Sequence, residues 1–113
     1  MGTLLYGNAT DGLEVSDRLL SHLMIVASTK LRRGESFTVT FTGISETGSG
    51  RTSIWLQPAI PLRFVYDDSE PCVVDRELLR SLADDASSSR GIVIDSASDL
   101  ESVARRFDHV RAA

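Results

Sequence analysis

Residues 36–42 read Ser-Phe-Thr-Val-Thr-Phe-Thr, so apolar and hydroxyl-bearing side chains alternate along the whole stretch. Successive side chains of a β-strand point to opposite faces of its sheet, and this alternation therefore predicts a half-buried strand. We expect Phe37, Val39 and Phe41 to face the core. The hydroxyl-bearing side chains between them are expected to face water.

Two more strands are predicted after this one. Residues 43–50 contain three glycines and no periodicity, which is typical of a hairpin loop, and residues 51–57 then resume a strand pattern. Residues 58–61 begin and end with proline, which cannot donate ladder hydrogen bonds, so we expect a turn before a strand at 62–67. These three strands are predicted to form a three-stranded antiparallel meander.

The N-terminal part predicts a hairpin followed by a helix. The short β-prone stretches 3–6 and 13–16 are separated by residues that tolerate tight turns. Ser16 or Asp17 is then placed to cap a helix over residues 17–33, in which leucines and alanines recur at three- and four-residue steps. Gly34 suits the left-handed position after a helix C-terminus, and the helix dipole accounts for the cations just before it.

The C-terminal part predicts a second helix, a short strand and a third helix. Asp75 is placed to cap the second helix, and the wholly apolar stretch 92–94 is expected to be a buried strand. Ser98 and Glu101 have the spacing of a capping box at the start of an amphipathic terminal helix. The expected fold class is therefore α+β: residues 1–97 form one compact domain, and residues 98–113 are a helical extension of it.

The composition indicates the class of protein and its expected location in the cell. The chain has 113 residues, a hydrophobic fraction of 42% and a net charge of −4, which is typical of one globular domain without a generally basic surface. The single cysteine, Cys72, excludes an intramolecular disulfide or a cysteine metal cluster. No stretch approaches the roughly 18 apolar residues of a membrane span, and no signal peptide is evident. We expect a cytoplasmic protein that does not bind membranes.

No catalytic or metal-binding pattern stands out. His22 and His109 are far apart in the sequence, and no group of residues has zinc-ligand spacing. At helical spacing His22 neighbours Arg18 and Val26, which predicts a boundary or solvent-facing position. Cys72 lacks the surroundings of a catalytic nucleophile and is expected to be a small, partly buried hydrophobe. We therefore expect no enzyme activity, no cofactor and no metal.

Three separate stretches carry a family resemblance. Residues 1–7, 30–37 and 50–62 together resemble a family of small uncharacterised actinobacterial proteins, over about residues 1–93. Members are sometimes labelled ATP-dependent DNA ligase, although the resemblance implies no site residue here. A ligase needs a lysine nucleophile in a K-x-D-G setting, and Lys30 is not in one.

The leading functional hypothesis is a self-associating protein-interaction module. Strands with apolar residues on both faces need cover on two sides, and a second chain is expected to supply part of it. The terminal helix packs either on its own domain or on another chain, and we expect the latter because the family resemblance ends before it. The predicted interaction surface comprises Trp55, Leu100, Val103, Phe107 and Val110.

The alternative is a nucleic-acid accessory protein, for which a link to DNA ligation or repair is one hypothesis. Clustered arginines can bind phosphates even when the net charge is acidic, and such binding weakens steeply with salt. Three of the candidate contacts are expected near one loop end and two on the terminal helix. These contacts are Arg32, Arg33 and Arg51, and Arg105 and Arg106, respectively.

Overall fold

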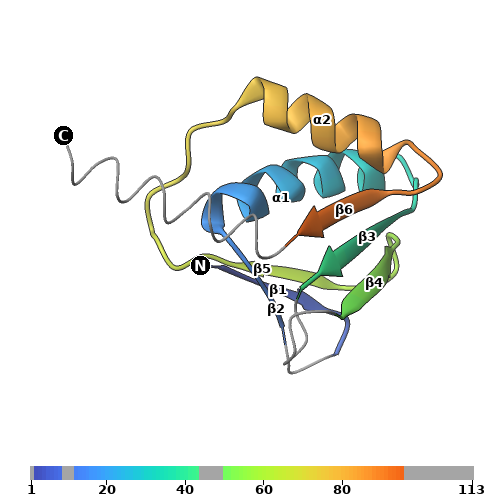
Figure 1. The fold of residues 1–113 in the computed structure, drawn as a ribbon, viewed down its shortest axis with the longest axis horizontal. Helices are drawn as coiled ribbons and strands as arrows, with labels where there is room; N and C mark the ends of the chain where they lie inside the picture. The colour runs from blue at the N-terminus through green and yellow to red at the C-terminus, as the bar shows by residue number, and fades with distance from the viewer. Residues whose placement is uncertain (1, 9–11, 44–49, 96–113) are drawn as a thin grey trace.

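The computed structural model describes residues 2–8, 12–43 and 50–95. Within these ranges two helices lie side by side over two small sheets (Figure 1), which confirms the α+β class. The predicted terminal helix at 98–113 lies outside the described residues. In chain order the elements are β1 Gly2–Tyr6, β2 Leu13–Val15, α1 Asp17–Arg32, β3 Phe37–Thr42, β4 Arg51–Leu56, β5 Leu62–Val65, α2 Arg76–Ala86 and β6 Ile92–Asp95.

The first sheet has the order β2-β1-β5, and both of its pairs are antiparallel. It confirms the N-terminal hairpin but shows that the predicted meander is wrong, because β5 pairs with β1 instead of β4. The Ile60 N–H donates to the Gln57 carbonyl in a turn, and the Gly7 N–H donates to the Pro61 carbonyl at 2.9 Å. This turn and the Pro61–Gly7 bond carry the chain from the second sheet to the edge of β1.

The second sheet has the order β4-β3-β6, with β4 antiparallel and β6 parallel to β3. The predicted alternation in β3 is confirmed, since Phe37, Val39 and Phe41 are all buried. The expectation of a wholly buried strand at 92–94 is wrong for Val93, which is 40% exposed. Because the helices cover only one face of this sheet, Val93, the second residue of β6, points to the uncovered face.

The core lies between the helices and the sheets, and local capping sets the helix boundaries. The Ser16 side chain accepts the Leu19 N–H at the start of α1, and the Asp75 carboxylate accepts the Leu78 N–H at the start of α2. Gly34 has a φ of +73°, which confirms the left-handed residue expected after α1. The helices bury Leu20, Leu23, Val26, Ala27, Leu82 and Ala86 in this core.

Candidate functional site

The uncovered side of the second sheet is the first candidate surface, which we call the open face. The strand registers place its residues in rows across the sheet, and the 2.7 Å hydrogen bond between the Thr40 and Ser53 hydroxyls shows that both point to this side. Trp55, one of the predicted interaction residues, is 52% exposed here. The open face comprises Thr38, Thr40, Thr42, Arg51, Ser53, Trp55, Val93 and Asp95.

Charge and side-chain size differ between the two edges of the open face. Thr42 pairs with Arg51 on one side and with Asp95 on the other, so opposite charges lie at the two ends of one row. Thr38 pairs with Trp55, and on its other side lies Gly91, one residue before the Val39–Ile92 pair. A Cβ on Gly91 would lie 2.3 Å from the Thr38 hydroxyl oxygen. A large exposed aromatic ring thus lies at one edge, whereas Gly91 at the other edge is buried against Thr38.

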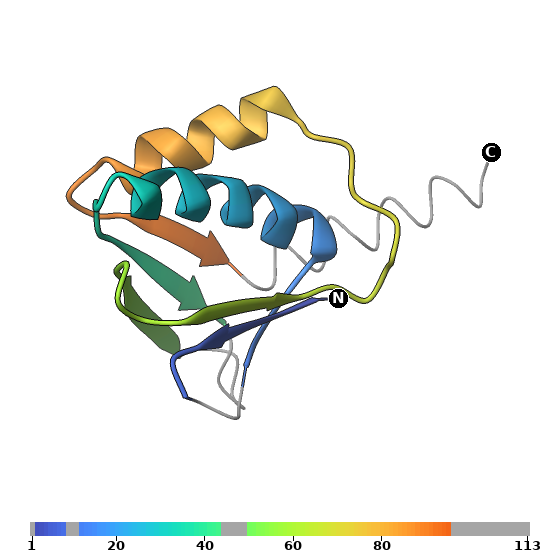
Figure 2. The ribbon, with the colours of Figure 1, turned by 180° about the vertical axis from the view of Figure 1, so that it is seen from behind.

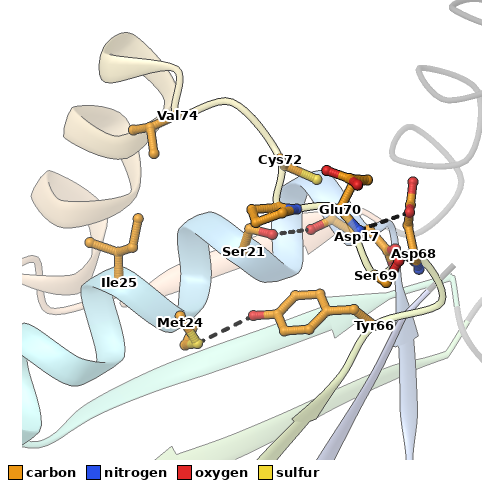
Figure 3. Close-up of a pocket in the computed structure, with 11 residues that line it drawn as sticks. Asp17, Ser21, Met24, Ile25, Tyr66, Asp68, Ser69, Glu70, Cys72 and Val74 are labelled. Atoms are coloured by element: carbon orange, nitrogen blue, oxygen red, sulfur yellow. Dashed lines mark hydrogen bonds between the residues drawn. The ribbon is translucent and has the colours of Figure 1, made fainter.

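The second candidate surface is a pocket between α1 and the connecting loop, which we define as residues 66–75. It has a volume of about 320 Å³ and opens to solvent. Its side chains come partly from α1 and partly from the loop, as Figure 3 shows. The pocket is lined by Asp17, Ser21, Met24 and Ile25 of α1 and by Tyr66, Asp68, Ser69, Glu70, Pro71, Cys72 and Val74 of the loop.

Side chains of α1 hold the connecting loop near both of its ends. The Asp17 carboxylate accepts the N–H groups of Asp67 and Asp68 at 3.3 and 3.0 Å. At the other end the His22 ring accepts the Asp75 N–H at 2.8 Å. Figure 2 shows the loop running from β5 past the beginning of α1 to α2. The connecting loop, which covers the pocket, is therefore held to α1 near both of its ends.

The contact of the His22 ring with the Asp75 N–H shows that the environment predicted for His22 from the sequence is wrong. The residue is only 1% exposed, instead of lying at the boundary or in solvent. Its Nε2 must carry a lone pair because a backbone N–H can only donate, so Nδ1 carries the proton and donates to the Arg18 carbonyl at 2.6 Å. A neutral histidine with both nitrogens satisfied is a structural residue at this position.

Asp75, which is the N-cap of α2, belongs to the same network of hydrogen bonds. Its carboxylate accepts the Leu78 and Glu77 N–H groups and contacts the Arg18 guanidinium at 2.6 Å. Hydrogen bonding to Leu78, opposed by desolvation but helped by Glu77 and Arg18, lowers the pKa of Asp75 below its ordinary value. The carboxylate is thus held in its charged form where α1 meets α2.

Tyr66 forms one wall of the pocket. Its hydroxyl donates to the Met24 sulfur at 3.3 Å (Figure 3). Burial raises the pKa of Tyr66, a hydrogen bond with Ser21 partly opposes this, and the neighbouring Asp17 and Cys72 raise it further. The phenol is therefore neutral at physiological pH and adds apolar surface to the pocket.

The pocket combines an apolar interior with an acidic rim. Of its eleven lining residues, Asp17, Asp68 and Glu70 are acidic, and none is basic. No group of three or more His, Cys, Asp or Glu side chains suited to a metal ion occurs in the part of the chain that the structure describes. The pocket is therefore suited to an apolar group accompanied by positive charge.

The structure does not bring the predicted phosphate-binding arginines together. Arg32 and Arg33 lie at the end of α1, near the start of β3, whereas Arg51 pairs with the last residue of β3. A six-residue strand separates these ends by about 17 Å. The other predicted residues lie outside the described ranges: Leu100, Val103, Arg105, Arg106, Phe107 and Val110.

Sequence reasoning missed the pocket, although part of its pattern is visible in the sequence. Asp17, Ser21 and Met24 recur at steps of four and three residues and so share one stripe of α1. The acidic loop that follows β5 was recognisable as a loop. Its course back across that stripe depends on the contacts of Asp17 and His22, which no local pattern reveals.

Comparison with known proteins identifies a family by its sequence. A family model described as "Domain of unknown function (DUF7882)" matches residues 1–97. No curated protein and no solved structure matches the chain. Among the described residues, neither helix is long and apolar enough to cross a membrane.

Proposed function

The chain belongs to the family of domains of unknown function DUF7882, and we propose that it is a non-enzymatic protein-interaction module that self-associates through the open face. The observation that carries this proposal is the position of Trp55, which is 52% exposed on the edge strand β4 of an uncovered sheet surface. Tryptophan is enriched among the residues that dominate binding energy at protein interfaces. A second sheet packed on the open face would cover the ring.

The pattern of the open face favours a second copy of the chain as the partner. If two copies packed face to face around a two-fold axis parallel to β3, the edge strand β4 of one copy would lie opposite the edge strand β6 of the other. Arg51 then faces Asp95 of the second copy, so the opposite charges at the two ends of this row would pair between the copies. Stacked sheets pack with their strands within about 30° of each other, which this arrangement allows.

The geometry gives less support to the nucleic-acid alternative. Its three candidate arginines in the described domain lie at opposite ends of β3 instead of forming one patch. Lys30, near Arg33, already contacts the Glu35 carboxylate at 3.2 Å. Electrophoretic retardation of DNA or RNA that weakens steeply with salt would favour this alternative over self-association.

Self-association is tested by light scattering coupled to size-exclusion chromatography over a range of protein concentrations. Trp55 is the only tryptophan, so its fluorescence reports the open face directly. We expect a dimer at high micromolar concentration and a blue shift of the emission as the dimer forms. Trp55→Lys should weaken dimerisation about 30-fold or more, the effect of losing a dominant interface side chain.

Val73→Lys is the matched control, because Val73 is 90% exposed but lies on the connecting loop, away from the open face. Arg51→Asp should weaken the dimer, and adding Asp95→Arg should restore it. A wild-type chain that remains monomeric at high concentration would refute the proposed function. Equal weakening by Trp55→Lys and Val73→Lys would refute the open face as the interface.

A further inference from the structure

The pocket under the connecting loop has an apolar interior, and its size suits one anchoring side chain. Met24 and Val74 remain exposed within it, and Tyr66 forms a wall. Its volume of about 320 Å³ lies at the lower end of the range for ligand sites, so it has room for one or two large side chains but not for a whole helix. The rim carboxylates of Asp17, Asp68 and Glu70 favour cationic groups beside that anchor.

The chain leaves its last strand at the pocket's end of the molecule. β3 begins five residues after α1 ends and runs back along it, and β6 is parallel to β3. β6 therefore ends at the side where α1 begins, as both ribbon views show (Figures 1 and 2). Asp17, at the beginning of α1, lines the pocket. Residues that follow Asp95 thus start out near this site.

The residues that follow have the complementary pattern in sequence. In the helix that the sequence predicts for 98–113, each residue turns by 100°, which puts Val103, Phe107 and Val110 on one stripe. Arg106 lies beside that stripe, whereas Arg105 lies on the opposite side of the helix. An apolar stripe flanked by arginine matches an apolar pocket with an acidic rim.

We infer that this pocket is the docking site of the chain's own C-terminal segment, residues 98–113, with Phe107 as the anchor and Arg106 at the acidic rim. This inference replaces the sequence-based expectation that the segment packs on another chain. With the predicted helix beginning at Ser98, the extended link through residues 96 and 97 spans about 10 Å, and the helix adds about 14 Å to reach Phe107, which allows the segment to return to its own domain. A tether this short gives an effective concentration in the millimolar range, which favours the chain's own segment over that of a second copy. The docked stripe would be removed from water without a partner chain.

Cys72 provides the test, because it lines the pocket and is the only cysteine in the chain. The rate of its alkylation by iodoacetamide, an uncharged reagent, reports whether the pocket is covered in the full-length protein. We expect Phe107→Ala to speed alkylation more than any other single change. Arg106→Glu should speed it about two- to fivefold, as expected for the loss of an exposed ion pair.

Arg105→Glu makes the same charge change on the opposite side of the predicted helix and should leave the alkylation rate unchanged. Far-UV circular dichroism identifies any variant that exposes Cys72 by unfolding. Equal rates in the wild type, Phe107→Ala and Arg106→Glu would overturn the inference. Protection that disappears on dilution would overturn it too, because the segment would then come from a second copy.

This test is independent of self-association through the open face. It is repeated in the Trp55→Lys background, in which the open face is changed but the pocket-lining residues are intact. Unaltered protection of Cys72 in that background supports docking within one chain, whatever the oligomeric state. Loss of protection there would show that the cover belongs to the dimer and would overturn the inference without affecting the proposed function.

Discussion

Replacing His22 by leucine tests whether the polar contact between the two helices is structural. His22 is almost fully buried, and its ring joins the Arg18 carbonyl to the Asp75 N–H through bonds of 2.6 and 2.8 Å. Leucine is an apolar side chain of similar bulk, so the substitution removes both hydrogen bonds without opening a large cavity. The Asp75 N–H then loses its ring acceptor where α2 begins.

The loss of this acceptor determines how much the free energy of unfolding should change. A buried donor without a partner costs about 1–3 kcal/mol, whereas the added apolar burial of leucine recovers only part of this. We therefore expect His22→Leu to lower the free energy of unfolding by about 2 kcal/mol. With a urea m-value of about 1.5 kcal/mol/M for a domain of this size, the unfolding midpoint should fall by about 1.3 M.

Urea unfolding followed by far-UV circular dichroism measures this change, because the only tryptophan is too exposed to report on the core. Thr29→Leu is the control on the same helix. Thr29 is exposed, and its hydroxyl only bonds back to the Ile25 carbonyl, so its replacement should change stability by less than about 0.5 kcal/mol. If His22→Leu costs no more than Thr29→Leu, the Asp75 N–H finds another partner and the structural role assigned to His22 is wrong.

Two further predictions concern Gly91 and Asp75. Gly91 has a φ of +76°, and an added Cβ would lie 2.4 Å from the Thr38 carbonyl oxygen, so Gly91→Ala should destabilise the protein by more than about 2 kcal/mol in urea unfolding. Gly34→Ala is the matched control, with a φ of +73° and no atom within 4 Å, and should cost only about 1 kcal/mol. Because the pKa of Asp75 is lowered by folding, its stabilising effect is fully present above the ordinary value of 3.8 and is lost as pH falls through the lower folded value. The stability advantage of the wild type over Asp75→Asn should therefore shrink as the pH is lowered below 3.8, and an advantage that stays constant across this range would contradict the assignment.

Features set by neighbouring residues were predictable from the sequence. The alternation in β3 and the capping residue Asp75 are local patterns, and the structure confirms both. The partner of β5 was not predictable, because pairing with β1 joins residues about sixty positions apart. The burial of His22 likewise depends on where α2 docks, so the periodicity of α1 alone gave the wrong environment.

The pocket and the open face are built by different elements and share no residue. One stripe of α1, including Asp17 and Met24, forms the pocket, whereas the open face lies on the side of β3 that points away from the helices. Substitutions at Trp55 and Phe107 should therefore act separately. Asp95 is the exception, since it lies on the open face and is also the last described residue before the C-terminal segment. If both proposed contacts form, Asp95 is therefore the residue through which dimerisation and docking of that segment would influence each other.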